Sequence, residues 1–200
     1  MKMTAGGFAI IRLKFGSLSQ DAVDNINLIV ETCEKYGLSY PQSAYVLATV
    51  LWETARTFKP IEEYGKGKGR KYGTWYTNTK GVKYGIAGSG GSTYLYSDYP
   101  HLYYGRGHTQ NTWLDNYKYI KQRTGVDVVN NPSLLLDSKL SAEVTVLAMK
   151  EGWYTSKKLS DYINDNKKDF VGARRIVNGT DKAKEIADYA VIMEKALRSY

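Results

Sequence analysis

The amino-acid sequence predicts a mainly α-helical fold, because apolar residues recur at helical spacing, helix caps precede them, and no stretch is rich in strand signals. The first clear helix covers residues 19–36, where apolar side chains return every three or four positions. Ser19 is a candidate cap at its start, and Gly37 is a stop signal at its end. No segment repeats at a fixed period, so we expect no repeat architecture.

A second helix is predicted from the segment Ser39-Tyr40-Pro41-Gln42. It combines a capping serine, an early proline and a glutamine three positions after the cap. An apolar stripe follows, and Glu53 falls where this helix ends. Packing of the stripe is therefore expected to hold Glu53 rigidly.

The rest of the chain alternates between irregular and helical segments. Residues 65–102 are rich in glycine and tyrosine, which predicts a long irregular loop, with a short hairpin as an alternative for part of it. Residues 1–16 indicate no definite structure, and the whole chain, residues 1–200, is interpreted as one domain. Helical signals return in five later segments, at residues 113–124, 141–152, 160–167, 169–177 and 181–198.

The composition points to an anionic partner. The chain carries a net charge of +8, which suits nucleic acid, a membrane face or an acidic cell-wall polymer. No nucleic-acid-binding motif accompanies the charge. The basic run at residues 66–71 is interpreted first as a solvated loop and only second as a binding patch. Eighteen tyrosines and four tryptophans suit a groove that stacks sugar rings, and suit half-buried surfaces equally well.

The single cysteine and the two histidines carry no recognisable chemistry. Cys33 lies in an apolar helical pattern and is interpreted as a buried thiol. It forms no metal-ligand pattern with His101 and His108, and neither histidine has a serine or cysteine partner motif. We expect no metal and no cofactor. A single cysteine allows no disulfide within the chain, which fits a protein made in a reducing cytoplasm. The apolar run at residues 8–11 is too short for a signal peptide or a membrane span, so we expect any export to need other machinery.

Three carboxylates are the candidates for catalysis. Glu53 follows Trp52 at the end of an apolar helix, where partial desolvation would raise its pKa and suit a general acid. The alternative is a solvent-facing glutamate with an ordinary pKa. Glu62 and Glu63 follow Pro60, which lets the chain turn back, and either one can supply the second carboxylate. Paired carboxylates beside an aromatic groove are what glycosidic bond cleavage requires.

A polar and aromatic segment about fifty residues later supplies candidates for substrate contacts. Thr112 and Asn116 are four residues apart, on one face of the helix that starts near Trp113, and together they can orient a water or hold a sugar hydroxyl. Gln110 and Tyr104 are expected to line the same groove. The alternative for Thr112 is a helix N-cap, and the two roles are compatible.

Two further motifs contain glycine. Gly105 and Gly107 flank Arg106, which predicts a backbone path that side chains would block. Arg106 is a further candidate for substrate binding. Asn178 before Gly179 is first of all a turn signal. The alternative is that the Asn178 side-chain amide faces the groove.

Taken in order, these motifs resemble glycoside hydrolase family 19 over residues 40–190. The matching segments are Glu53-Thr54-Ala55, Phe58-x-Pro60-Ile61-x-Glu63, Tyr103-Tyr104-Gly105-Arg106-Gly107-x-x-Gln110-x-Thr112 with Asn116-Tyr117, Val129-Asn130-Asn131-Pro132 and Ala173-Arg174-Arg175-Ile176-Val177-Asn178-Gly179. The resemblance implies a lysozyme-like, two-lobed α-helical domain with a cleft. It also implies an inverting mechanism with Glu53 as the acid and a downstream carboxylate, best aligned with Glu63, as the base.

The resemblance includes residues of the substrate groove, but the sequence differs from the family pattern at several positions. It implies that Thr112 holds the nucleophilic water. His108 and Thr109 replace the usual pair after Gly107, Asn111 replaces an apolar residue, and residues 74–102 have no counterpart. The groove residues that it implies are Gln110, Asn116 and Asn178.

The function that we expect is an endolysin-type hydrolase that cleaves β-1,4 bonds of bacterial peptidoglycan. The positive charge, the lack of disulfides and the lack of a signal peptide favour a phage enzyme that is made in the host cytoplasm and acts on the cell wall. We expect a monomer whose partner is the glycan strand, with no nucleic acid and no stable membrane insertion. The alternatives are a chitinase and a non-catalytic wall-binding module, although a pure binder needs no acid at position 53.

Overall fold

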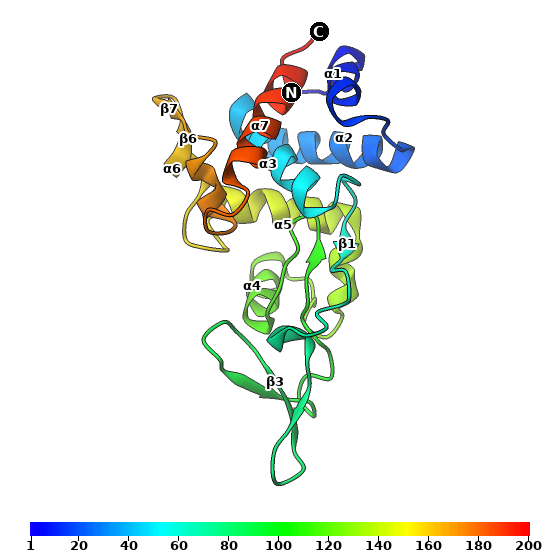
Figure 1. The fold of residues 1–200 in the computed structure, drawn as a ribbon, viewed down its shortest axis with the longest axis vertical. Coiled ribbons are helices and arrows are strands. Elements are labelled where there is room, and N and C mark those ends of the chain that lie inside the picture. The colour runs from blue at the N-terminus through cyan, green and yellow to red at the C-terminus, as the bar shows by residue number, and fades with distance from the viewer. The chain divides into compact units, whose positions relative to one another are not determined.

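The computed structural model describes residues 1–200, and it confirms a mainly α-helical fold (Figure 1). About 49% of the chain is helical when three short 3-10 helices are counted with the seven α-helices, and the seven strands have only two to four residues each. The chain divides into two compact units. The first contains Met1–Lys59 and Ala142–Tyr200, and the second contains Pro60–Ser141. None of the helices is both long enough and apolar enough to cross a lipid bilayer.

A central helix organises the first unit. Every residue of α3 (Tyr40–Glu53) from Ser43 to Leu51 is buried, so α3 is covered on all sides and not along a single stripe. The main contacts of α3 are with α7, and α1 also packs on α7 (Figure 1). The other elements of this unit are α1 (Ala5–Phe15), α2 (Gln20–Lys35), most of α5 (Ser138–Glu151), α6 (Leu159–Tyr162), β6 (Ile163–Asn164), β7 (Lys167–Lys168), η3 (Gly172–Ile176) and α7 (Ala183–Leu197).

Two predicted helix starts of this unit, at Ser19 and Ser39, are confirmed. The Ser19 hydroxyl accepts a hydrogen bond from the Ala22 N–H at 3.1 Å. Ser39 and Gln42 form the predicted capping box, in which the Ser39 N–H donates to Gln42 Oε1 at 3.1 Å. Cys33 is buried, as predicted, and burial raises the pKa of its thiol to about 12. Both helices therefore begin where their local chemistry predicts.

Three segments of the first unit differ from the prediction. The helix predicted over residues 169–177 is only the short 3-10 helix η3. The N-terminal segment forms helix α1, whose cap is the Thr4 hydroxyl. A helix predicted over residues 160–167 is wrong beyond Tyr162, because β6 and β7 form a hairpin there. The Asn164 side chain makes this turn by accepting hydrogen bonds from the Asn166 and Lys167 N–H groups at 2.9 and 3.2 Å. Local side-chain bonding thus outweighs helical periodicity.

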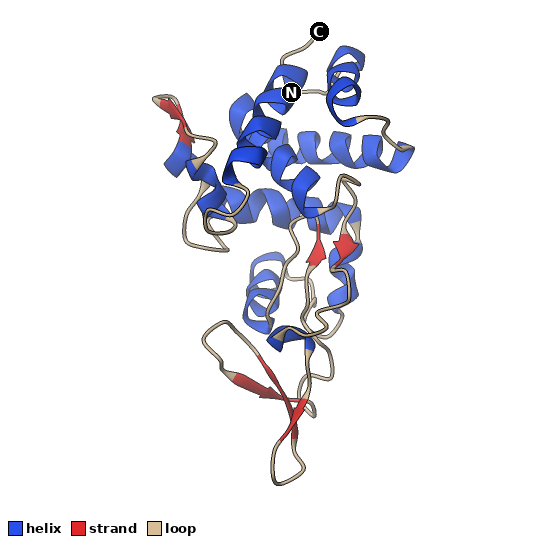
Figure 2. Cartoon of the chain, in the orientation of Figure 1, coloured by secondary structure: helices blue, strands red, loops and turns tan.

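The second unit contains most of the β-structure (Figure 2). The expectation of an irregular loop over residues 65–102 is wrong in part, because three strands form an antiparallel sheet in the order β2-β3-β4. A second, two-stranded sheet pairs β1 with β5, with Ile61 opposite Gly107. The elements are β1 (Ile61–Glu62), η1 (Lys71–Gly73), β2 (Tyr76–Thr77), β3 (Lys83–Ile86), β4 (Thr93–Leu95), β5 (Arg106–Gly107), α4 (Leu114–Thr124) and η2 (Pro132–Leu136).

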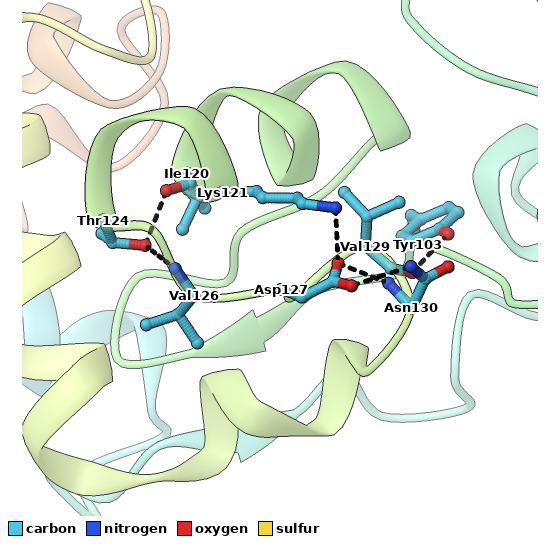
Figure 3. Close-up of polar contacts among 8 residues, drawn as sticks. All are labelled: Tyr103, Ile120, Lys121, Thr124, Val126, Asp127, Val129 and Asn130. Atoms are coloured by element: carbon cyan, nitrogen blue, oxygen red, sulfur yellow. Dashed lines mark hydrogen bonds and ion pairs between the residues drawn. The ribbon is translucent and has the colours of Figure 1, made fainter.

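Tyrosines form much of the core of the second unit. The Tyr103 ring meets Tyr94 and Tyr117 edge to face, with centroids 5.8 and 4.9 Å apart. The Tyr103 hydroxyl donates to the Val129 carbonyl oxygen at 2.7 Å (Figure 3). The high tyrosine content therefore serves packing in this unit, with each buried phenol needing a polar partner.

The loop after α4 brings the Val129 carbonyl to Tyr103 (Figure 3). Asp127 fixes this loop by accepting hydrogen bonds from the Asn130 side chain at 2.7 Å and the Asn130 N–H at 3.1 Å. Lys121 adds an ion pair at 3.1 Å. The hydrogen bonds from Asn130, and then Lys121, lower the pKa of Asp127 to about 2.

Candidate functional site

Helix α3 places Glu53 at its last position, and the backbone then reverses sharply. The buried Thr54 hydroxyl donates to the Val50 carbonyl at 2.7 Å and accepts from the Phe58 N–H at 2.9 Å. Ala55, Arg56 and Phe58 have positive φ angles of 50°, 70° and 58°. Such backbone is costly for residues other than glycine and persists only where surrounding contacts impose it. Glu53 is thus held by packing on one side and a strained turn on the other.

The Glu53 carboxylate forms an ion pair with a buried arginine. Arg174 Nη1 lies 3.2 Å from Glu53 Oε1, and the two side chains are 3% and 18% exposed. Burial raises the pKa of Glu53, and the charge and hydrogen bond of Arg174 oppose that rise without cancelling it. The prediction that Glu53 is partly desolvated is confirmed. A carboxyl group with a raised pKa is suited to donate a proton.

Arg174 is a residue whose role the sequence does not reveal. It lies in η3, and its Nε donates to the Asp181 carbonyl oxygen at 2.8 Å. Its own carbonyl accepts from the Asn178 N–H at 2.9 Å, so Asn178 belongs to the same local structure. Asn178 itself is exposed, and its Oδ1 accepts from the Gly179 N–H at 2.8 Å. The expected turn at Asn178-Gly179 is confirmed, whereas a substrate contact by Asn178 stays a prediction.

Glu63, in the second unit, has both carboxylate oxygens held by donors. Its Oε1 accepts from the Tyr72 hydroxyl at 2.7 Å, and its Oε2 accepts from the Gly105 N–H at 3.0 Å. The Glu63 N–H also donates to the Gly105 carbonyl at 2.7 Å. Glu62 lies on β1 opposite Arg106 and forms an ion pair with Lys66 at 3.5 Å. The two neighbouring glutamates therefore have separate partners.

Tyr72 is a second residue whose role the sequence does not reveal. Its ring meets Trp113 edge to face, with centroids 5.0 Å apart. Burial, followed by the neighbouring Glu63, raises the pKa of Tyr72 to about 12. The phenol therefore remains a hydrogen-bond donor to Glu63 throughout the neutral range.

Gln110 joins the loop after β5 to strand β1. Its Nε2 donates to the Ile61 carbonyl at 2.8 Å and to the Gly107 carbonyl at 3.0 Å. A Cβ atom at Gly105 would lie 2.8 Å from Gln110 Oε1 and 3.3 Å from the Glu63 Cβ. The prediction that side chains would block this path is confirmed, because glycine is what lets the Gly105 N–H reach Glu63.

Thr112 and Asn116 are also linked to this network. The Thr112 hydroxyl donates to the Gln110 carbonyl at 2.9 Å, and Asn116 Nδ2 donates to the Thr112 carbonyl at 2.7 Å. The interpretation of Thr112 as an N-cap is wrong, because Trp113 occupies the cap position of α4 without a side-chain hydrogen bond. Trp113 has a φ angle of 75°, which carries the chain into the helix by another path.

Arg106 is buried in the second unit, where its side chain makes several hydrogen bonds. It is 6% exposed, and its Nη1 donates to the Leu102 carbonyl and to the Tyr117 hydroxyl, both at 3.0 Å. Its guanidinium stacks 3.8 Å from the centroid of the half-buried Tyr104 ring. These contacts favour a structural role for Arg106, and substrate binding by either residue stays a prediction.

The candidate residues therefore fall into two sets, one in each unit. In the first unit, Glu53 and Asn178 are both tied to Arg174. In the second, Tyr72, Glu63 and Gly105 form one hydrogen-bonded group, and Gln110, Thr112 and Asn116 form another. The two groups are in contact where Gln110 packs against Gly105. Glu62 and Arg106 flank these groups on the paired strands β1 and β5.

Comparison with known proteins bears on the fold. No protein-family model and no curated protein matches the chain. Among solved structures, a bacterial family 19 chitinase is similar, with 19% identity and a TM-score of 0.54 over 96% of this chain and 94% of that chain. Chitinase C from Streptomyces griseus is also similar, with 16% identity and a TM-score of 0.53 over 98% of this chain and 70% of that chain. The chain thus has the lysozyme-like fold of family 19 chitinases, as its motifs imply.

Proposed function

We propose that this protein is a glycoside hydrolase that cleaves β-1,4 glycosidic bonds by an inverting mechanism with two carboxylates. The observation that carries the proposal is the Glu53 carboxyl at the buried end of α3, whose pKa burial raises. A general acid must hold its proton until the leaving oxygen takes it, and a raised pKa favours that state. The shared fold with two chitinases supports the same class of reaction.

In the proposed reaction, Glu53 protonates the glycosidic oxygen as the bond to the anomeric carbon breaks. Glu63 accepts a proton from the water that attacks the opposite face of that carbon, and the configuration inverts. Tyr72 and the Gly105 N–H orient the Glu63 carboxylate through hydrogen bonds of 2.7 and 3.0 Å. We assign Thr112 to hold the attacking water, with Gln110 and Asn116 fixing the backbone around it.

The proposed substrate is bacterial peptidoglycan, which places the protein with the endolysins. Chitin is an uncharged polymer, whereas peptidoglycan carries carboxylates, and a net charge of +8 favours the anionic one. A chitinase is the second candidate, because both similar structures are chitinases.

The test is to digest purified peptidoglycan and chitin oligosaccharides and to analyse the products by mass spectrometry and NMR. We expect soluble fragments from peptidoglycan, with a new reducing end that is initially the α-anomer. The Glu53→Gln variant is the control and should release none. Products from chitin alone would make the protein a chitinase. Binding to peptidoglycan without products from either polymer would identify a wall-binding module.

A further inference from the structure

One segment of the second unit concentrates the positive charge of the chain. Residues 64–97 contain six lysines and arginines and no aspartate or glutamate, so their net charge is +6. The net charge of the whole protein is +8. All six are exposed. Only Lys66 forms an ion pair with a carboxylate. The six are Lys66, Lys68, Arg70, Lys71, Lys80 and Lys83. We call residues 64–97 the basic segment.

The basic segment also carries half-buried and exposed aromatic rings on and beside its sheet. The Lys83 ammonium lies 4.2 Å from the centroid of the Tyr96 ring and 5.5 Å from that of Trp75. Tyr96 is 40% exposed. In the register of the sheet, Tyr76, Tyr84 and Leu95 lie side by side, and the two tyrosine rings stack 5.5 Å apart. The Lys83 ammonium on β3 is thus fixed next to the rings of Trp75 and Tyr96, which directly precede β2 and follow β4.

The sheet that carries these groups is closely packed at its centre. The Tyr94 ring packs directly over Gly85, where an added Cβ would lie 2.8 Å from the ring. Trp75 meets both Tyr94 and Tyr96 edge to face, at 5.5 and 5.0 Å. A surface that is already ordered loses little conformational entropy when it binds a polymer.

The basic segment is continuous with the network that holds Glu63. Lys71 precedes Tyr72 in η1, Tyr72 donates to Glu63, and η1 packs against β3. A glycan strand that reaches Glu63 would therefore meet exposed cations within the same unit. Exposed aromatic rings can stack on sugar rings, while ammonium groups attract carboxylates.

We propose that the basic segment is a docking surface for peptidoglycan, in which its lysines bind the carboxylates of the polymer and Tyr96 and Trp75 contact the sugars. The inference rests on the proposed function for the choice of a glycan as the partner. It adds a binding surface outside the candidate catalytic residues. Single-stranded nucleic acid shares the need for cations and aromatic rings, so it enters the test as a competitor.

The experiment measures binding of the full chain to purified peptidoglycan from which phosphate-containing polymers have been removed. Every protein carries Glu53→Gln, so that the polymer stays intact. One variant adds Lys68→Gln, Lys80→Gln and Lys83→Gln. The matched control adds the same change at three exposed lysines of the first unit, so both variants lose three charges. The control positions are Lys157, Lys184 and Lys195.

We expect the basic-segment variant to bind about eightfold more weakly at low salt, because each exposed ion contact is worth a factor of about two. The control should stay within about twofold, and raising salt from about 0.05 to about 0.5 M should remove the difference through screening. Tyr96→Ser should weaken binding at both salt concentrations. Circular dichroism of each variant checks that the fold is retained.

Equal weakening in both triple variants would show that net charge alone drives binding and would overturn the proposal. Unchanged binding in the basic-segment variant would do the same. Displacement of peptidoglycan by an equal charge of single-stranded oligonucleotide would reassign the surface to nucleic acid. These outcomes do not depend on turnover, whereas failure of the proposed function would appear as a wild-type protein that releases no products.

Discussion

Replacing Glu53 by glutamine tests the chemistry and the electrostatics of this position together. Glutamine keeps nearly the same shape but cannot donate a proton to a leaving oxygen. General acid catalysis contributes about 10²–10⁴-fold, so turnover of peptidoglycan should fall by that factor. This loss corresponds to about 2.7–5.4 kcal/mol of transition-state stabilisation, at about 1.36 kcal/mol for each tenfold.

The same substitution has a predictable effect on stability. Burial raises the pKa of Glu53 above its ordinary value of 4.5, and Arg174 offsets only part of that rise. Ionisation of Glu53 therefore costs more free energy in the folded protein than in the unfolded chain. The contribution of the protonated carboxyl to stability is fully present below pH 4.5 and is lost as the pH rises through the raised pKa. At neutral pH the glutamine variant should be at least as stable as the wild type.

The glutamine side chain also leaves Arg174 with an acceptor. Its amide oxygen can take the place of Glu53 Oε1, which lies 3.2 Å from Arg174 Nη1. The arginine therefore keeps one hydrogen bond, although it loses the opposite charge. Removing the acceptor entirely, as in Glu53→Ala, should instead cost about 3–5 kcal/mol, because the buried guanidinium keeps its hydrogen bond to the Asp181 carbonyl but loses its anionic partner.

Urea unfolding at a series of pH values between about 4 and 8 measures how the cost of burying the Glu53 carboxylate compares with its attraction to Arg174. The free energy of unfolding of the variant, minus that of the wild type, should increase with pH. Glu185→Gln is the control, since Glu185 is 51% exposed and lies 3.9 Å from Lys182 on the surface. A difference that decreases with pH would mean that the attraction of Arg174 exceeds the effect of burial. Retention of more than half of the turnover would refute Glu53 as the acid.

Two further predictions concern the neighbouring carboxylates and the strained turn. Glu63→Gln should lower turnover by about a hundredfold or more, and Glu62→Gln should stay within a few-fold, because only Glu63 is held by Tyr72 and a backbone N–H. Steady-state rates of wall lysis distinguish the two, and the reverse ranking would move the base to Glu62. Ala55→Gly should raise the free energy of unfolding by up to about 1 kcal/mol in urea, because its φ of 50° suits glycine. A loss of stability would show that the turn is not strained.

Local chemistry made part of the fold predictable. Ser39 and Gln42 satisfy each other's backbone groups within one turn of α3, so their short-range pattern survives any tertiary context. The same helix leads to Glu53, whose partial burial follows from the apolar residues before it. The hairpin at residues 163–168 was not predicted, because the helical pattern there is short and the turn formed by Asn164 competes with it.

The partners of the two carboxylates could not be predicted because they come from distant parts of the chain. Arg174 lies 121 residues from Glu53, and no periodicity relates them. Tyr72 lies only nine residues from Glu63, but an irregular path connects them. The role of the many tyrosines could not be predicted either. Composition does not distinguish a tyrosine in the core, such as Tyr103, from one on the surface, such as Tyr96.

The surroundings of Glu53 and Glu63 differ in the way that a two-carboxylate mechanism requires. Glu53 ends a helix whose preceding residues are buried, and the loss of water there favours the protonated form. Glu63 follows a short strand, where a phenol and a backbone N–H both donate to it and use it only as an acceptor. A helix end inside a core and a strand edge lined with donors thus suit opposite halves of acid–base chemistry. This difference supports the proposed assignment of Glu53 as acid and Glu63 as base, which the two glutamine variants test.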